Sequence, residues 1–242
     1  MEYRVAFLVQ VFGMILNNGA YFIFWIIFFD RFKQVRGWEL NDMFILFGIA
    51  ASGFGLGVFL FGNMTTLSDI IARGQLDYYL SLPRPILLHV LASRSVSSGL
   101  GDFTYGILSF LAAGQFTVDA MVRFLVGTLL AMIVFLSFMV LVHSLTFYIG
   151  NASMLSQQFF NAIITFALYP ISLFEGTAKF ILFFIIPAAF MGSVPAEFVI
   201  QASWLRLGEL CLAAIIVLAL SLLFFHHGLR RYESGSAIQS QV

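Results

Sequence analysis

The sequence predicts an all-α integral membrane protein formed by a single transmembrane domain over residues 1–242. Two observations lead to this fold class. Hydrophobic residues make up 61% of the chain and charged residues only 10%, and the mean hydropathy is +0.98. The apolar residues also gather in uncharged runs long enough for a helix to cross a bilayer. Because the formal net charge is zero, no basic field favours nucleic acid as a partner.

The gaps between charged residues place the crossings. A membrane helix needs about 20 mostly apolar residues, because each adds about 1.5 Å to a layer about 30 Å thick. The third span carries Asp102 near its end, and the uncharged run 124–174 holds two spans with a turn at 150–153. We expect six transmembrane helices near residues 8–29, 43–63, 97–118, 124–148, 154–174 and 207–228.

A further apolar segment, residues 179–198, is predicted to enter the membrane and return on the same side. Its uncharged part is short for a crossing, and each proline in it removes a backbone donor and bends the chain. Broken backbone at membrane depth is tolerated where protein covers it. We assign Pro170, Pro187 and Pro195 to this re-entrant hairpin between spans five and six, with a seventh span as the alternative.

The longest polar connection, residues 64–96, is predicted to contain a short amphipathic helix. Leu67, Ile70 and Ile71 recur at helical spacing, with polar residues on the other faces. Thr66 followed by Asp69 resembles a capping box, and Gly74 suits a helix end. The segment Leu-Pro-Arg-Pro then favours extended backbone. An ordinary solvated loop lying on lipid headgroups is the alternative reading.

The spaced glycine, proline and aromatic motifs resemble the permease subunits of type-2 ABC exporters, and more narrowly a bacterial branch of six-span permeases. The resemblance extends from the first span to residue 236. It is carried by GNMTTLSDIIARGQLDYYLSLPRP, Gly37-Trp38, Tyr169-Pro170-Ile171-Ser172, Ile186-Pro187-Ala188-Ala189-Phe190, Pro195-Ala196 and Gly228-Leu229-Arg230-Arg231-Tyr232-Glu233-Ser234.

The resemblance implies that the connection between spans two and three holds a coupling helix that docks on a nucleotide-binding subunit. It places both termini in the cytoplasm of a bacterial cell, with the chain in the cytoplasmic membrane. The twelve Lys and Arg residues, evenly divided between the two sides, do not decide this orientation. The positions that match the coupling helix are Thr65, Thr66, Leu67, Asp69, Ile70, Ile71, Arg73, Gly74, Leu76 and Asp77.

The family pattern also makes the first residues an interfacial helix ahead of the first span. Tyr3, Arg4, Phe7 and Gln10 fit an amphipathic lead-in of this kind. Lipid at the membrane surface is therefore an expected contact of this end of the chain.

The chain itself is not expected to be an enzyme, because it contains no G-x-x-x-x-G-K-[ST] phosphate-binding loop. Gly53 and Gly57 form a G-x-x-x-G pair that favours close helix packing. No cofactor or metal is predicted in this chain. The resemblance implies two copies of a soluble ABC ATPase that bind ATP and Mg, together with a second permease, identical or homologous.

The expected function is export of a substrate that the sequence does not specify. The alternatives are an ATP-independent secondary transporter or channel, and a membrane scaffold that transports nothing. A proton-coupled carrier is expected to place acidic residues in the middle of its spans, whereas Asp102, Glu175 and Glu209 lie near ends.

Polar residues within the spans are the candidates for a substrate pathway, or for hydrogen bonds between helices. His143 is expected to bond another helix, with a substrate contact as the alternative. Asp102 is expected to pair with Arg94 or Arg73 and so to link the coupling loop to the bundle. The other candidates for the conduit or for interhelical contacts are Asn17, Asn18, Gln157, Gln158 and Asn161.

Overall fold

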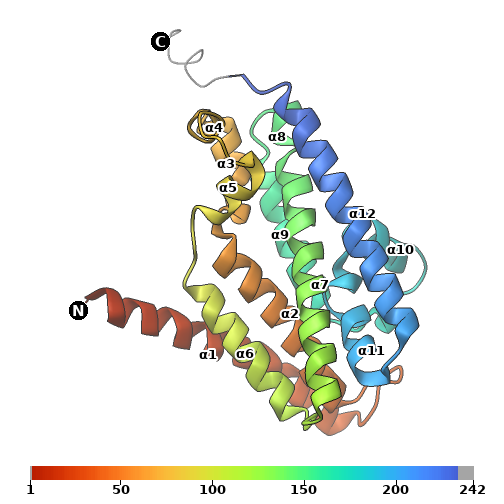
Figure 1. Cartoon of the computed structure of the whole chain (residues 1–242). Helices are drawn as coiled ribbons and strands as arrows, with labels where there is room; N and C mark the ends of the chain where they lie inside the picture. The colour runs from red at the N-terminus through yellow and green to blue at the C-terminus, as the bar shows by residue number, and fades with distance from the viewer. Residues whose placement is uncertain (1, 234–242) are drawn as a thin grey trace.

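The computed structural model describes residues 2–233, and within this range the chain is helical with no strand (Figure 1). This confirms the all-α class. The helices long and apolar enough to cross a membrane are α1 (Glu2–Arg31), α2 (Leu40–Leu60), α7 (Val118–His143) and α12 (Trp204–Leu229). A fifth candidate is the bent pair formed by residues Gly176–Phe184 and Ala188–Gln201.

Two of the predicted spans are shorter than expected. Helices α6 (Ser98–Ala112) and α9 (Ser153–Ala167) have 15 residues each. Each therefore rises roughly 22 Å, less than the hydrocarbon thickness of about 30 Å. Helix α6 is followed by Gly114 in the left-handed region, and α9 ends before Pro170. The boundaries 97–118 and 154–174 were thus too long, and the six-span arrangement stays a prediction.

The amino-terminal lead-in is not a separate interfacial helix. It forms the first turns of α1, which continues without interruption from Glu2 to Arg31. The side chains of Arg4, Phe7 and Gln10 are exposed, and that of Tyr3 lies outside the described side chains. No proline breaks this helix, so the backbone has no reason to turn between the lead-in and the span.

Helix α2 runs through the centre of the bundle and packs against α6 and α7. Its contact with α6 depends on glycine. A Cβ on Gly55 would collide with the carbonyl oxygen of Gly99, and a Cβ on Gly99 would collide with that of Gly55. The predicted pair Gly53 and Gly57 faces α7 instead, where an added Cβ would lie 3.3 Å or more from its neighbours. Small residues thus allow both approaches.

The bent segment after α9 consists of α10 (Gly176–Phe184), a short 3-10 turn (Ala188–Phe190) and α11 (Ser193–Gln201), with a bend of 65°. Pro170 and Pro187 each precede a 3-10 turn, and Pro195 lies in the first turn of α11. The Ser193 hydroxyl links the hairpin to the segment that follows α9. Its Oγ accepts a hydrogen bond from the Ile171 nitrogen at 2.8 Å.

Different elements form the two ends of the bundle (Figure 1). At one end lie α3 (Leu67–Ala72), α4 (Leu76–Leu80), α5 (Ile86–Ala92), α8 (Thr146–Ile149) and the carboxyl end of α12. At the other end lie the α1–α2 connector, the α6–α7 connector and α11.

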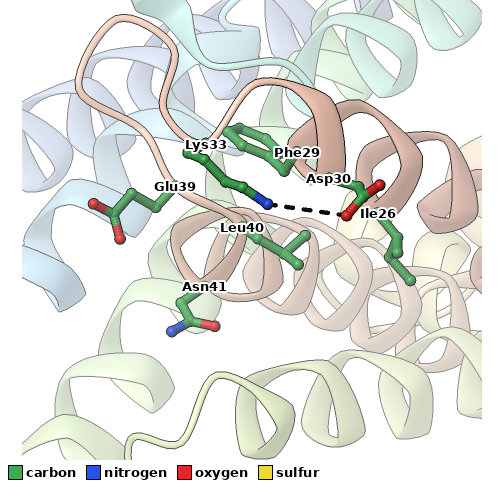
Figure 2. Close-up of a pocket in the computed structure, with 7 residues that line it drawn as sticks. All are labelled: Ile26, Phe29, Asp30, Lys33, Glu39, Leu40 and Asn41. Carbon is green, nitrogen blue, oxygen red and sulfur yellow. Dashed lines mark ion pairs between the residues drawn. The ribbon is translucent and has the colours of Figure 1, made fainter.

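Charged side chains interact at both ends of the connector between α1 and α2. Figure 2 shows the shallow pocket beside it, where Lys33 Nζ lies 3.9 Å from Asp30 Oδ1. Glu39 and Asp42 form a capping box at the start of α2. The capping box stabilises the start of α2, whereas the Lys33–Asp30 pair is almost fully exposed and contributes little.

Candidate functional site

Residues 66–93, here called the cap, fold into the three short helices α3, α4 and α5 over one end of the bundle. Helix α3 ends in a Schellman motif, as the glycine predicts. The Gln75 nitrogen donates to the Ile70 carbonyl at 3.0 Å, and Gly74 has a φ of +69°. The predicted capping box at its start is wrong, because Thr66 makes no side-chain cap bond to the helix.

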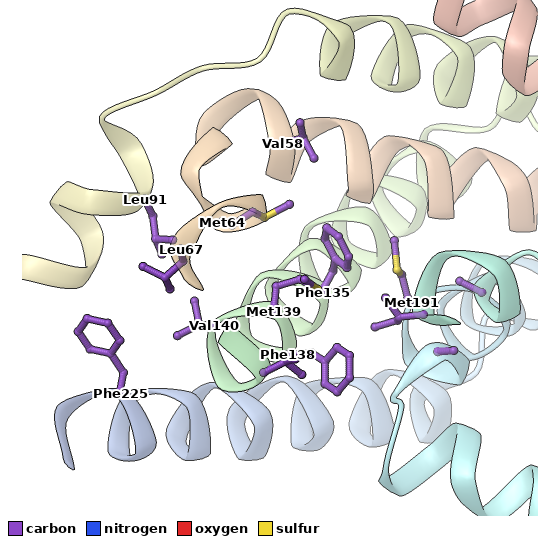
Figure 3. Packing of buried hydrophobic residues seen from close by; sticks show 14 of the residues in the cluster. Val58, Met64, Leu67, Leu91, Phe135, Phe138, Met139, Val140, Met191 and Phe225 are labelled. Atoms are coloured by element: carbon purple, nitrogen blue, oxygen red, sulfur yellow. The ribbon is translucent and has the colours of Figure 1, made fainter. Parts of the chain in front are cut away.

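The apolar face of the cap packs inside the protein. Leu67, Ile70 and Ile71 are buried and belong to the same core cluster as Phe135 and Met139 of α7. In Figure 3, Leu67 lies between Leu91 and Val140. These side chains were expected to form a docking surface for another subunit. The structure places them, together with Leu76, in the core of this chain.

The cap is also fixed to the bundle by a buried polar cluster. The Ser68 nitrogen of α3 donates to His143 Nδ1 at 3.1 Å, and the Ser68 hydroxyl lies 2.6 Å from the same atom. The Ser68 hydroxyl also lies 3.0 Å from that of Ser156 on α9. All three residues are buried. Because a backbone nitrogen can only donate, Nδ1 accepts, and the neutral ring carries its proton on Nε2.

This cluster gives His143, the last residue of α7, a hydrogen-bond partner on another helix, α3. Sequence reasoning missed Ser68 and Ser156. The only signal was a histidine within an apolar run, which predicts a polar partner without identifying it.

A second set of hydrogen bonds joins the two ends of the cap. Asn63 Nδ2 donates to the Val90 carbonyl at 2.9 Å and to Ser93 Oγ at 2.8 Å. The Tyr79 hydroxyl lies 2.9 Å from Ser93 Oγ, and the Gly62 nitrogen donates to the Arg94 carbonyl at 2.8 Å. These contacts join the start of the cap to its end.

The outward face of the cap is basic and aromatic. Arg73 and Arg84 are exposed, and no ion pair engages either of them within the described part of the chain. Tyr78 is 66% exposed and Leu80 42% exposed on the same short segment. An exposed aromatic ring beside free guanidinium groups is typical of a surface that meets another protein.

Of the predicted docking residues, the exposed one is Arg73. The half-buried ones are Thr65, Thr66, Asp69, Gly74 and Asp77.

The end of α12 reaches the cap. Burial and the neighbouring Asp77 raise the pKa of Tyr232 to about 12, which indicates that its phenol lies close to the Asp77 carboxyl of the cap. The Arg231 guanidinium lies 5.0 Å from the centroid of the Tyr148 ring, next to α8. The Arg-Arg-Tyr segment of the family pattern therefore lies beside the cap, while its last residue, Ser234, falls outside the described residues.

Asp102 is not joined to the cap. Its Oδ1 accepts a hydrogen bond from Asn18 Nδ2 of α1 at 2.6 Å. No ion pair links Asp102 to Arg94 or Arg73 in residues 2–233. The reason is geometric, because Asp102 lies in the helical part of α6 with Gly101 against the α1 backbone, whereas Arg94 lies in the α5–α6 connector.

The predicted polar residues of the spans fall into two groups. Asn17 and Asn18 line a cavity beside α1. Gln157, Gln158 and Asn161 are exposed on α9, where the Gln157 amide donates to Asn161 Oδ1 at 3.1 Å. The structure does not bring the two groups into one cavity.

The fold defines an all-helical, multi-pass membrane protein with a cap of three short helices at one end of the bundle. The sequence model of the family described as ABC-2 family transporter protein matches residues 15–236, nearly the whole chain. The chain belongs to this family, which confirms the resemblance drawn from its motifs. Membership supports a role as the permease of an ABC transporter. The comparisons with curated proteins and with solved structures gave no match.

Proposed function

We propose that this chain is the permease subunit of a bacterial ABC exporter, driven by ATP that separate soluble subunits hydrolyse. These subunits, two per transporter, bind ATP and Mg and dock on the outward face of the cap. The proposal rests on the cap having one buried apolar face and one exposed basic face. Leu67 and its apolar neighbours fix it to the bundle, while Arg73, Tyr78 and Arg84 remain free for a partner.

The contacts between the cap and the bundle transmit a movement of the cap to the membrane helices. Helix α3 contacts α7, α8 and α9, and the Ser68 cluster joins it to Ser156 in the first turn of α9 and to His143 in the last turn of α7. When ATP closes the ATPase pair, the docked cap moves and takes the ends of these helices with it. The nucleotide thereby favours one of two arrangements of the bundle, each of which opens to a different side.

Exposed polar side chains on α9 support the presence of a second permease, identical or homologous. Gln157, Gln158 and Asn161 are exposed on this helix. One bond joins Gln157 to Asn161, and contact with another helix supplies partners for the remaining donors and acceptors of these amides, which lipid does not.

In this arrangement the cap and both chain ends are cytoplasmic. The neighbourhood of Tyr232 and Asp77 supports this for the carboxyl end, because it puts the end of α12 at the cap. The hairpin formed by α10 and α11 then lies toward the exterior.

Co-purification tests the docking surface. Expressed with its genomic neighbours, the chain is expected to retain a soluble subunit with a phosphate-binding loop. The double change Arg73→Glu and Arg84→Glu is expected to release that subunit, because both guanidinium groups are exposed and opposite charge repels the former partner surface. The double change Arg31→Glu and Lys33→Glu, which alters the charge by the same amount at the opposite end of the bundle, is the matched control because both side chains are exposed.

Retention of the soluble subunit by the double variant contradicts docking on this face. Absence of any ATPase from the wild-type preparation favours the ATP-independent transporter or the scaffold instead.

A further inference from the structure

A cavity of about 380 Å³ lies between α1, α2, α6 and α9. This volume is in the range of small-molecule sites. Its wall is rich in aromatic rings contributed by different helices, among them Tyr21 and Trp25 of α1, Phe54 of α2 and Phe160 of α9. Aromatic side chains therefore line the cavity on several sides.

One carboxylate lies in this aromatic wall. Asp102 is 3% exposed, and it lines the cavity together with the amides of Asn17 and Asn18. Its Oδ1 accepts the Asn18 hydrogen bond, whereas Oδ2 has no hydrogen-bond partner in the described residues. No Lys, Arg or His is among the described residues that line the cavity. A buried carboxylate without a counter-ion is costly, and a cation in the cavity removes this cost.

The ligand chemistry follows from these two features. Aromatic faces attract cations through the ring quadrupole and also bind apolar groups. A single acidic group selects positive charge but does not accommodate a strongly hydrated metal ion, which requires several oxygen ligands. The wall thus fits an organic cation with an aromatic or alkyl body.

The position of the cavity suits a ligand that partitions into membranes. Helix α1 meets the bundle along a narrow face, because only 11% of its most apolar window is buried. Tyr21 is 64% exposed and marks the rim of the cavity on this side. A membrane-soluble cation can therefore reach the cavity beside α1 without crossing the packed core of α2 and α7.

We propose that this cavity binds lipophilic organic cations, with Asp102 as the charge partner and the rings of α1, α2 and α9 as the walls. That such a cation is the exported substrate rests on the proposed function. Binding itself does not, because every residue involved belongs to this chain.

The test uses the full chain in lipid nanodiscs and a pair of probes of the same shape and opposite charge. Binding of tetraphenylphosphonium and of tetraphenylborate is measured by equilibrium dialysis, with empty nanodiscs of the same lipid subtracted. The wild-type chain is expected to bind the cation and to discriminate against the borate. Asp102→Asn is expected to weaken cation binding about tenfold, which corresponds to about 1.4 kcal/mol. The asparagine can still accept the Asn18 hydrogen bond.

Two further variants separate the site from a general effect of charge or folding. Asp30→Asn removes an exposed carboxylate at the bundle end and is expected to leave binding unchanged. Tyr21→Leu keeps the carboxylate but removes an exposed ring face, and it is expected to weaken cation binding severalfold. Because Tyr21 is largely exposed, this variant folds even where Asp102→Asn does not.

Equal binding of both probes by the wild type, or wild-type affinity for the cation in both Asp102→Asn and Tyr21→Leu, overturns the proposal. The assay contains neither ATP nor a second subunit. Cation binding without ATP-dependent transport of the cation therefore leaves the site intact and refutes the cation as the exported substrate, whereas ATP-dependent transport of another substrate without cation binding refutes the site alone.

Discussion

The link between the cap and α7 yields a quantitative prediction. Ser68→Ala removes the hydroxyl that lies 2.6 Å from His143 Nδ1 and 3.0 Å from Ser156 Oγ. At about 0.5–1.5 kcal/mol for each hydrogen bond, the loss is about 1–3 kcal/mol of unfolding free energy. His143→Leu leaves the buried Ser68 nitrogen without an acceptor, and a cost of similar size follows.

Because both changes remove the same bond, their effects are expected to be non-additive. The double variant should be more stable than the sum of the single effects implies, with an interaction energy between about 0.5 and 3 kcal/mol. Thermal unfolding of the purified chain in detergent measures it, since about 1 kcal/mol shifts the midpoint of a chain of this size by roughly 2–4 °C.

Ser137→Ala is the matched control on the same helix. The Ser137 hydroxyl is buried in α7 but has no hydrogen-bond partner in the described part of the chain, so its removal is expected to be neutral or stabilising. Additive effects of Ser68→Ala and His143→Leu refute the link. So does a loss of stability in Ser137→Ala that equals the loss in Ser68→Ala.

Two further predictions concern packing. Gly99→Ala places a methyl group against the α2 backbone and should cost about 1–3 kcal/mol or more, whereas Gly208→Ala, with open space around it, should raise stability slightly in the same unfolding assay. A stable Gly99→Ala chain contradicts the close approach of α2 and α6. Leu67→Ala should cost about 2–5 kcal/mol because its side chain is fully buried, while Leu88→Ala, 55% exposed, should change stability by less than about 0.5 kcal/mol. Equal stability of these two variants means that the cap does not pack as described.

The class of the protein could be predicted because long uncharged apolar runs have few physical solutions. The lengths of the helices were harder to predict from the sequence. Uncharged residues continue past the end of α6 and past the end of α9, so the gaps between charges do not mark where these helices stop. The stops come from backbone features, namely Gly114 in the left-handed region and the proline after Tyr169.

The cap shows what a pattern predicts and what it leaves open. The spacing of Leu67, Ile70 and Ile71 predicted a short helix with one apolar face, and α3 has that face. An apolar face does not say which surface covers it. Here the chain's own core covers it, and the surface available to a partner is the opposite one.

Partners distant in sequence could not be predicted either. For Asp102, charge alone suggested Arg94 or Arg73, yet its partner is Asn18 of α1. The capping box expected at Thr66 occurs at Glu39 with Asp42 instead. In each case several residues satisfied the local rule, and the tertiary contacts selected among them.

The central claim is that the outward face of the cap lies in the cytosol and contacts a soluble ATPase. The most direct measurement is maleimide labelling of Tyr78→Cys in a Cys211→Ser background, which removes the chain's single native thiol. A membrane-impermeant maleimide is expected to label inside-out vesicles and not right-side-out vesicles, and the co-expressed ATPase subunit should protect the thiol. Labelling from the exterior, or labelling that the ATPase leaves unchanged, contradicts the claim.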